Sequence, residues 1–381
     1  MRLAPFAVLA ASFAFSGCHA VSFASQPFDV RRPQPSPPAV FTVDWRVKLV
    51  GPQLWESNPR EPASPAVDPD TGRVIALTRD GYVRSINEDG KIEWEVKTLD
   101  PFVAGATVKD GIVYVPGGDG ILYALRARDG SVVWKYDSEE QLATGPLVTE
   151  HRVYVASQGS TLFAVDRDSG KWLWQYRRDL PSGFMIQGVS APTLSMGTLY
   201  IGFADGYVVA LDPETGEAKW ERSLSGSGTE FLDVDTTPII DDAGRLIVAS
   251  YKQGVFGLNA DTGEVEWRNE VGGITHTLRR GEVIVTSGDE GVGALLAENG
   301  KQLWFLRLPE RSAGAPVFVR GMLVLPIDES LLFVDPATGA ATFSWDPGRG
   351  VTATPTWGNQ HLYVLSNTGW LYALRLTGGL G

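Results

Sequence analysis

Short apolar and β-branched runs, separated by turn residues, recur along the chain from about residue 41 onwards. In the stretch 106–136, ATV, IVYV, ILYALR and SVVWKY are separated by Asp110-Gly111, Gly117–Gly120 and Arg128–Gly130. Such runs predict β-strands, and the Gly and Asp residues between them predict tight turns. No segment keeps a helical period over 11 residues. The pattern therefore predicts an all-β protein built from four-stranded antiparallel units.

A Gly-x-x-x-Trp motif ends each of these units. The copies are DGKIEW, DGSVVW, SGKWLW, TGEAKW, TGEVEW and NGKQLW, and a seventh copy, TGAATF, ends in phenylalanine. Their aromatic ends are Trp94, Trp134, Trp174, Trp220, Trp267, Trp304 and Phe343. Successive ends are 37 to 47 residues apart. Four strands in about 40 residues form the blade of a β-propeller.

The two ends of the repeat region complement each other. FTVDWRVKL, residues 41–49, is a lone strand that contains Trp45, whereas residues 353–376 offer only three strands. We expect the N-terminal strand to complete the last blade and close the ring. With Trp45 the outer-strand aromatics number eight. The sequence therefore predicts an eight-bladed β-propeller, with seven blades as the nearest alternative.

The repeated motif is interpreted as architecture. In DPETGEAKW, residues 212–220, the glycine stands where a turn needs positive φ. The tryptophan offers a large flat surface to a neighbouring blade. The residues expected to bond the turn amides are Asp166, Asp212, Asn259 and Asp335. A cofactor pocket would need such residues once, whereas every blade needs to dock on the next.

The first 17 residues have the features of a signal peptide. Arg2 precedes an apolar run from Leu3 to about Phe15, which is too short to span a bilayer. The run ends in FSGC, which resembles a bacterial lipobox although the first position is usually leucine. We expect cleavage before Cys18 followed by acylation of this residue. An ordinary signal peptide with an incidental cysteine is the alternative.

Acylation of Cys18 would anchor the chain to a membrane. His19 follows it in place of the Asp that tends to retain enteric lipoproteins in the inner membrane, which favours the periplasmic side of the outer membrane. Residues 18–40 are rich in proline and predict an extended tether. The predicted division is a signal peptide over 1–17, a lipidated tether over 18–40 and the propeller over 41–381.

The net charge and the single cysteine argue against several kinds of partner and of thiol chemistry. The net charge is −12 and the pI is about 4.9, which disfavours binding to nucleic acid. The same charge gives no attraction to anionic lipid, so membrane association depends on the anchor. Cys18 is the only cysteine. Once acylated, it leaves no thiol for a disulfide, a metal or a nucleophile.

No catalytic or metal-binding signature stands out. His19, His151, His276 and His361 are isolated and lack metal-ligand spacing. There is no G-x-S-x-G motif, and the Gly-rich SGSGTE stretch opens no helix. DPDTG, residues 68–72, resembles the start of a calcium loop but is interpreted as a hairpin turn. We therefore predict no catalytic residues and no metal.

The docking motif resembles the repeat of the eight-bladed quinoprotein dehydrogenases, which bind pyrroloquinoline quinone (PQQ). The likeness covers nearly the whole repeat region but is specific for the fold only. Those enzymes typically have longer chains, a calcium site and often a disulfide of adjacent cysteines, which one cysteine cannot supply. No cofactor is expected, although a PQQ-dependent dehydrogenase remains one alternative.

Two stretches depart from the repeat spacing, at residues 177–194 and 223–240. Insertions in a propeller map to loops on one face, where binding usually occurs. QGVSAPTL and FLDVDTTPII in these stretches resemble the BamB family, the lipoprotein propellers of the outer-membrane β-barrel assembly complex. The resemblance implies contacts with the periplasmic domains of the BamA-like, barrel-forming subunit. By position, the contacts fall to Phe184, Met185, Ile186, Gln187, Asp233 and Asp235.

Local alternatives stay open for these residues. Gln187 replaces the family's usual basic residue, which puts an expected salt bridge in doubt. Phe184, Met185 and Ile186 form an apolar run that marks an interface if exposed, or else tucks back onto the propeller. Asp233 and Asp235 contact a partner or else bond the backbone of their own loop.

The resemblance implies a non-enzymatic scaffold that assists assembly and insertion of outer-membrane β-barrel proteins. Exposed blade edges are also expected to pair transiently with unfolded barrel clients by strand addition. A lipoprotein propeller that serves another cell-surface or export complex is the main alternative, since its repeats would look alike.

Overall fold

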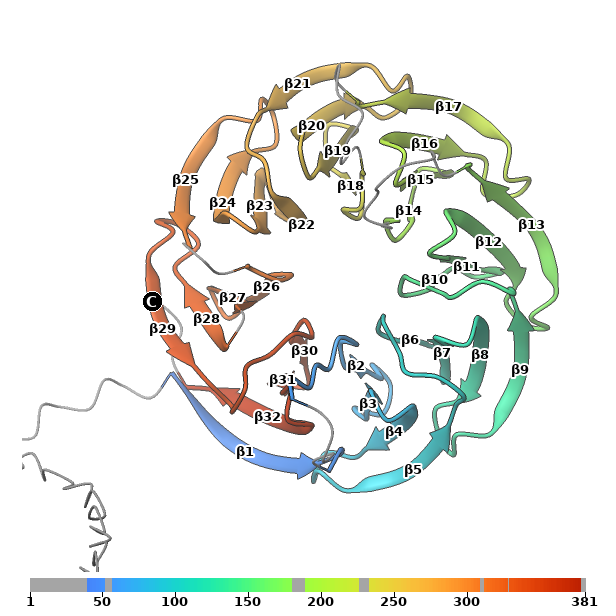
Figure 1. The fold of residues 1–381 in the computed structure, drawn as a ribbon, viewed down its shortest axis with the longest axis vertical. Coiled ribbons are helices and arrows are strands. Elements are labelled where there is room, and N and C mark those ends of the chain that lie inside the picture. The colour runs from blue at the N-terminus through green and yellow to red at the C-terminus, as the bar shows by residue number, and fades with distance from the viewer. Residues whose placement is uncertain are drawn as a thin grey trace, which may run out of the picture. The chain divides into compact units, whose positions relative to one another are not determined.

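The structure is a computed structural model that describes residues 40–51, 57–179, 189–225, 233–308, 312–327 and 329–377. Every regular element in these ranges is a β-strand, and the strands form eight four-stranded antiparallel sheets. The sheets stand as blades around a central axis (Figure 1). The predicted eight-bladed propeller is confirmed, and the seven-bladed alternative is wrong. Among the described residues no helix is long and apolar enough to cross a membrane.

Seven blades follow the chain from the innermost to the outermost strand. Blade 1 comprises β2 (Ala66–Val67), β3 (Val74–Thr78), β4 (Tyr82–Ile86) and β5 (Ile92–Lys97). Blade 2 comprises β6 (Thr107–Lys109), β7 (Ile112–Pro116), β8 (Ile121–Arg126) and β9 (Val132–Asp137). Blade 3 comprises β10 (Leu147–Val148), β11 (Arg152–Ala156), β12 (Thr161–Asp166) and β13 (Trp172–Arg177). Blade 4 comprises β14 (Thr193–Ser195), β15 (Thr198–Gly202), β16 (Tyr207–Leu211) and β17 (Ala218–Ser223).

The remaining blades continue the same order until the ring closes. Blade 5 comprises β18 (Ile239–Ile240), β19 (Arg245–Ser250), β20 (Gly254–Asn259) and β21 (Val265–Asn269). Blade 6 comprises β22 (Ile274–Arg280), β23 (Val283–Gly288), β24 (Gly291–Leu296) and β25 (Gln302–Arg307). Blade 7 comprises β26 (Val317–Val319), β27 (Met322–Ile327), β28 (Ser330–Val334) and β29 (Ala341–Trp345). Blade 8 comprises β30 (Thr356–Gly358), β31 (His361–Leu365), β32 (Trp370–Leu376) and β1 (Phe41–Lys48).

The N-terminal strand closes the ring, as the sequence predicts. β1 pairs antiparallel with β32 and forms the outer strand of blade 8. On the surface, the Asp44 carboxylate accepts hydrogen bonds from Arg375 of β32 and contacts Nε2 of His361 in β31 at 2.8 Å. The last blade is therefore assembled from both ends of the propeller sequence.

The middle strands of each blade carry most of the core. In blade 3, Val153–Ala156 of β11 and Thr161–Val165 of β12 are all buried. Both faces of a blade are covered by neighbouring blades, so these strands are continuous apolar runs. The outer strand β13 instead alternates, with Trp174 buried and Gln175 exposed.

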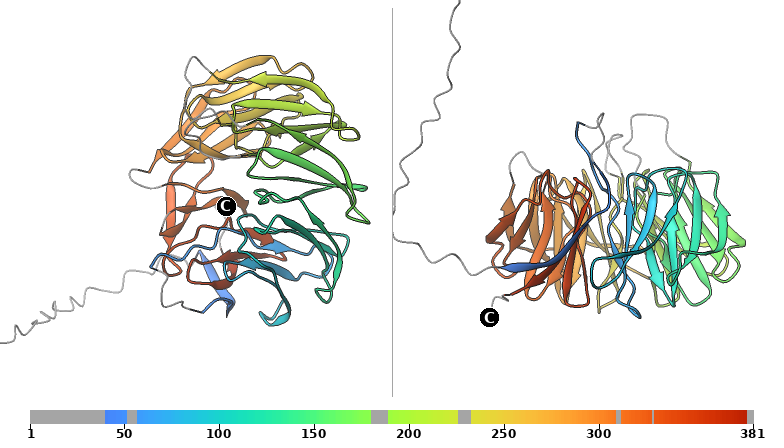
Figure 2. Two further views of the ribbon diagram at one scale, coloured as in Figure 1. Left: turned by 45° about the vertical axis from the view of Figure 1, so that its right-hand side comes forward. Right: turned by 90° about the horizontal axis from the view of Figure 1, so that it is seen from below.

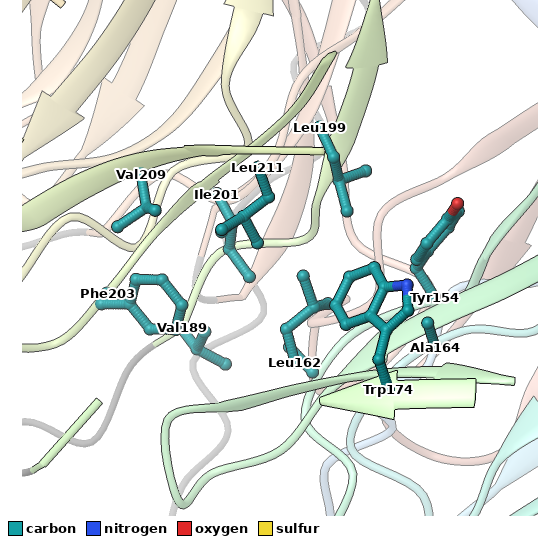
Figure 3. Packing of buried hydrophobic residues seen from close by; sticks show 11 residues of the cluster. Tyr154, Leu162, Ala164, Trp174, Val189, Leu199, Ile201, Phe203, Val209 and Leu211 are labelled. Carbon is teal, nitrogen blue, oxygen red and sulfur yellow. The ribbon is translucent and has the colours of Figure 1, made fainter. Parts of the chain in front are cut away.

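Contact between successive blades is mainly apolar. Figure 3 shows Leu162 and Trp174 of blade 3 packed near Leu199, Ile201 and Leu211 of blade 4. Complete burial of such a side chain contributes about 1.5–3 kcal/mol relative to exposure. Similar clusters join the other blades around the ring.

The strands alternate in direction, so their connections fall on two opposite faces of the ring (Figure 2). The hairpin face carries the turns from the first to the second strand and from the third to the fourth, such as 149–151 and 167–171 in blade 3. The connector face carries the turns from the second to the third strand and the blade-to-blade connections, such as 157–160 and 138–146.

Candidate partner-binding face

On the hairpin face, the outer-strand tryptophans pack against glycines of the next blade. The pairs are Trp45–Gly90, Trp94–Gly130, Trp134–Gly170, Trp174–Gly216, Trp220–Gly263, Trp267–Gly300 and Trp304–Gly339. In six of them the indole N–H also donates a hydrogen bond of 2.9–3.2 Å to a backbone carbonyl of that blade. The repeated motif thus lies at the junctions between blades.

The geometry of one copy explains its residue types. Gly216 has a φ of +75°, and a Cβ at this position would lie 2.5 Å from a ring carbon of Trp174. The Asp212 carboxylate accepts hydrogen bonds from the amides of Glu214 at 2.8 Å and Thr215 at 3.1 Å. Glycine is required both by the left-handed backbone and by the indole that rests on it.

The two junctions of blade 8 differ from the rest. Trp45 packs on Gly90, but its indole nitrogen is buried without a hydrogen-bond partner among the described residues. Phe343 contacts Phe41 and Phe333, with ring centroids 6.0 and 5.5 Å away. The third and fourth strands of blade 8 come from opposite ends of the chain, so no turn joins them and none receives an indole from blade 7.

Several predicted site residues lie outside the described residues. These are the proposed lipidation site and the first predicted contact loop: Cys18, Phe184, Met185, Ile186 and Gln187. Their predicted roles rest on the sequence. Asp233 and Asp235 are described, and they lie in the connection from blade 4 to blade 5, on the connector face.

The segment 233–238 is held firmly between two blades. The Thr236 hydroxyl accepts a hydrogen bond of 2.8 Å from the amide of Ala249 in blade 5. On the other side, a Cβ on Gly202 of blade 4 would lie 2.3 Å from the carbonyl oxygen of Val234. Both aspartates therefore stand on a braced backbone.

Both aspartates are in an unusual environment. Asp233 is only 2% exposed. One carboxylate oxygen of Asp233 and one of Asp235 are buried and lack a hydrogen-bond partner among the described residues. Burial raises the pKa of Asp233, and burial together with the charge of Asp233 raises the pKa of Asp235 to about 7.

Asp235 lines a cavity of about 490 Å³, which we call the channel-mouth cavity. Its lining comes mainly from connections that lead into the inner strands of the blades, together with β22 and the turn between β11 and β12, so it lies on the connector face near the axis of the ring. His276 of β22 lines it too, and Thr275 Oγ1 lies 2.9 Å from its Nδ1. Burial lowers the pKa of His276 to about 4, which leaves this imidazole neutral at pH 7.

A second hollow of about 700 Å³ lies on the same face, over the junctions around blade 8. Arg60, Arg349, Glu329 and Asp346 line it and give it charges of both signs. It is the larger of the two, but it contains neither of the aspartates predicted from the sequence.

The sequence reading missed the association of His276 with Asp235. It treated His276 as isolated because its neighbours in the cavity come from other blades. One signal was present in the repeats. TGP, SAP and TTP at residues 144–146, 190–192 and 236–238 are preceded by Ala143, Val189 and Asp235, so one blade places a carboxylate where two others place apolar residues.

The described residues contain no group of three or more His, Cys, Asp or Glu side chains that could hold a metal ion. In the DPDTG stretch, the Asp68 carboxylate accepts hydrogen bonds from the Asp70 amide at 3.1 Å and the Thr71 hydroxyl at 2.5 Å. These contacts are those of a turn closed by its own aspartate.

Sequence comparison identifies close relatives over most of the chain. The sequence profile described as outer membrane protein assembly factor BamB matches residues 79–287 and 257–380. The assembly factor BamB of Legionella pneumophila (strain Paris) is 37% identical over 322 residues, which cover 82% of this chain and 83% of the relative. That of Escherichia coli K12 is 34% identical over 277 residues, 68% of this chain and 70% of the relative.

Solved structures give the same fold. BamB from Moraxella catarrhalis superimposes with a TM-score of 0.75 at 25% identity, covering 88% of this chain and all of that one. A quinohemoprotein alcohol dehydrogenase from Comamonas testosteroni reaches 0.69 at 15% identity, covering 90% and 77% of the two chains, and this likeness concerns the fold alone. The sequence match over most of its length shows that this chain belongs to the BamB family of outer membrane protein assembly factors.

Proposed function

We propose that this protein is a non-enzymatic scaffold for the assembly of outer-membrane β-barrel proteins. Membership of the BamB family carries the proposal, because relatives that are 34–37% identical to it over the aligned residues are named outer membrane protein assembly factors. The absence of a catalytic signature in the sequence is consistent with a binding role.

The proposed place of action is the periplasmic side of the outer membrane. The lipobox-like FSGC and the proline-rich stretch after it support acylation of Cys18 and a long tether. An extended chain of about 20 residues reaches roughly 60 Å, so the propeller can stand off from the membrane.

The proposed partner is the barrel-forming subunit of the assembly complex, bound through its periplasmic domains. The connector face is the favoured surface, since both sequence insertions fall in blade-to-blade connections. The braced segment 233–238 carries both aspartates there; Asp233 is buried, whereas Asp235 is partly exposed and lines the channel-mouth cavity. An interface of this kind gains affinity from groups held in place before binding.

The test is affinity purification of the full-length lipoprotein from detergent-solubilised membranes of its own host. We expect the barrel-forming subunit to co-purify, and Phe184→Asp with Ile186→Asp to reduce its recovery at least tenfold. Trp172→Asp is the matched control, because Trp172 is an exposed residue, 54% accessible, on the outer rim of blade 3. Recovery of an unrelated export complex in place of the barrel subunit would refute the proposal.

A further inference from the structure

The second hollow holds charges of both signs that do not pair with one another. We call it the junction hollow, because it lies over the junctions that blade 8 makes with blades 7 and 1. Its charged lining residues are Arg60, Arg349, Glu329 and Asp346. Within the described ranges no ion pair joins any two of these side chains. Both signs of charge are therefore available to a ligand.

Arg60 and Glu329 have no internal partner in the part of the chain that the structure describes. Arg60 is exposed, whereas the neighbouring acid Glu61 is buried and pairs with Arg79 instead. Glu329 is exposed in the turn from β27 to β28. Each of the two charges can bind a ligand without first giving up a contact within the protein.

Arg349 is held in place by the backbone around it. Its φ is +58°, which is uncommon for a residue with a side chain, and such conformations cluster at functional sites. The Asp346 carboxylate accepts hydrogen bonds from two amides of the turn that carries Arg349. The Arg349 guanidinium donates one hydrogen bond, of 2.9 Å, to the carbonyl of Ser57. A guanidinium has five N–H donors, so most of them remain for a ligand.

The connection into blade 3 shows that this position does not require an arginine. DSEEQLATGP leads into blade 3 and DPGRGVTATP leads into blade 8, and the two align without a gap, with Glu140 opposite Arg349. Glu140 accepts hydrogen bonds of 3.3 Å from Thr161 and 3.2 Å from Arg177, both in blade 3. The acid thus bonds within its own blade, whereas Arg349 lines a hollow.

The unpartnered positive and negative charges stand on opposite sides of blade 8. Arg60 belongs to the segment that leads into β2 of blade 1, whereas Glu329 belongs to blade 7. Blade 8 lies between these two blades in the ring (Figure 1). Arg349 lies beside the Arg60 segment, because it bonds Ser57. The hollow therefore has a basic side towards blade 1 and an acidic side towards blade 7.

The size and the charges of the hollow favour a small zwitterion. A volume of about 700 Å³ accommodates a small organic molecule. Guanidinium groups bind a carboxylate or a phosphate, and a carboxylate binds a primary ammonium group. A ligand with a single charge would leave one side of the hollow unpaired. The described residues contain no group of three His, Cys, Asp or Glu side chains that could hold a metal ion there.

We propose that the junction hollow binds a small zwitterion, with its anionic group on Arg60 and Arg349 and its primary ammonium group on Glu329. The ligand is either a free compound that resembles an amino acid or the phosphoethanolamine headgroup of a lipid, and the chemistry of recognition is the same. A ligand bound there bridges blades 7, 8 and 1 and stabilises the closed ring. The site does not depend on the assembly function proposed above.

The first experiment measures binding of 6-aminohexanoate and of glycerophosphoethanolamine to the full-length protein. It uses titration calorimetry in a nonionic detergent, at pH 7 and low ionic strength. Hexanoate and n-hexylammonium are the matched probes for 6-aminohexanoate, because each keeps the chain and one of the two charges. We expect one-to-one binding of a zwitterion, and at least fivefold weaker binding of either single-charge probe. If neither zwitterion binds, or if the single-charge probes bind equally well, the proposal is wrong.

The two zwitterions also distinguish the sources of the ligand. Tighter binding of glycerophosphoethanolamine identifies a lipid headgroup, and tighter binding of 6-aminohexanoate identifies a free compound that resembles an amino acid. Either result supports a zwitterion site.

Two variants locate the charges. Glu329→Gln should remove the advantage of 6-aminohexanoate over hexanoate, because it removes the partner of the ammonium group. Arg60→Gln should instead reduce the advantage over n-hexylammonium. Glu266→Gln at an exposed position of β21, and Arg128→Gln in an exposed turn of blade 2, make the same charge changes elsewhere and should leave both preferences unchanged. Unaltered preferences in both hollow variants would contradict the assignment.

Discussion

The hairpin face and the connector face of the ring differ in how far their loops repeat from blade to blade. On the hairpin face, one turn is repeated from blade to blade, and six indoles bond to a carbonyl of the next blade. On the connector face, the blade-to-blade connections differ in length and residue type, and two carboxylate oxygens in one of them have no partner among the described residues. The repeated turn serves the packing between blades, which every blade requires. The connections that differ between blades are the places where we expect binding residues.

We expect the hairpin face to determine mainly stability and the connector face to determine mainly binding. An indole packed on glycine and bonded to a carbonyl lowers the free energy of the folded ring at each junction. A braced segment with an unsatisfied buried carboxylate raises it. We expect changes on the hairpin face to act on unfolding, and changes on the connector face to act on binding with little loss of stability.

The largest effect is expected from Trp174→Ala. The side chain is 7% exposed, packs on Gly216 and donates a hydrogen bond of 3.2 Å to the carbonyl of Pro213. Its loss should lower the free energy of unfolding by about 3–5 kcal/mol, measured by urea denaturation. Trp172→Ala, two residues earlier on the same strand, removes a side chain that is 54% exposed and should change stability little. Equal losses would show that packing between blades is not the cause.

Glycine substitutions test the same face more finely. Gly216→Ala should cost about 2–4 kcal/mol, because the residue has positive φ and its new Cβ would meet the indole of Trp174. Gly111→Ala has nearly the same backbone, with φ of +72°, but nothing lies within 4 Å of the added carbon. It should cost only about 1 kcal/mol. Thermal unfolding of the two variants separates backbone strain from the clash.

Asp235→Asn tests the connector face through pH. The pKa of Asp235 rises from 3.8 to about 7 on folding, so the folded state holds this proton more tightly than the unfolded state. Its contribution to stability is present below about pH 4 and is lost as the pH rises through 7. The asparagine variant should therefore be more stable than the parent by about 1–3 kcal/mol at pH 8, and similar to it near pH 4. Urea denaturation at both values checks the sign.

The smallest effect is expected at the surface of blade 8. Hydrogen bonds from Arg375 and His361 lower the pKa of Asp44 to about 2. The stabilising effect is present above about pH 4 and is lost as the pH falls through 2. The groups lie at the surface and are screened by solvent, so Asp44→Asn should cost about 0.5 kcal/mol at neutral pH, and less at high salt. A double-mutant cycle with Arg375→Gln measures the coupling, and a coupling well above 1 kcal/mol would contradict this expectation.

The fold follows from the sequence because its signals are local and repeated. Asp212, Gly216 and Trp220 belong to one short stretch, and each has a role that its neighbours in sequence reveal. Ring closure was also predictable, because the repeat region begins with a single strand at residues 41–49 and ends with three strands at residues 353–376, which together make one four-stranded blade.

The candidate site follows from the sequence only in part. The insertions and the resemblance point to Asp233 and Asp235, but not to the burial of Asp233 or to the unpartnered oxygens. His276 and Gln158 join Asp235 only because the ring brings three blades together at its axis. The spacing of these three residues along the chain does not predict that they line one cavity.

The closure of blade 8 also sets the order in which the molecule can be completed. Phe41 pairs with Leu376, and Asp44 bonds Arg375 across 331 positions of sequence. We expect contacts so distant in sequence to form late in folding, because the entropy cost of closing a long loop precedes the stabilisation that they provide. Until β1 and β32 meet, each of them presents an open strand edge that can pair wrongly. The pairing of β1 with β32 therefore requires that the whole propeller sequence has been synthesised.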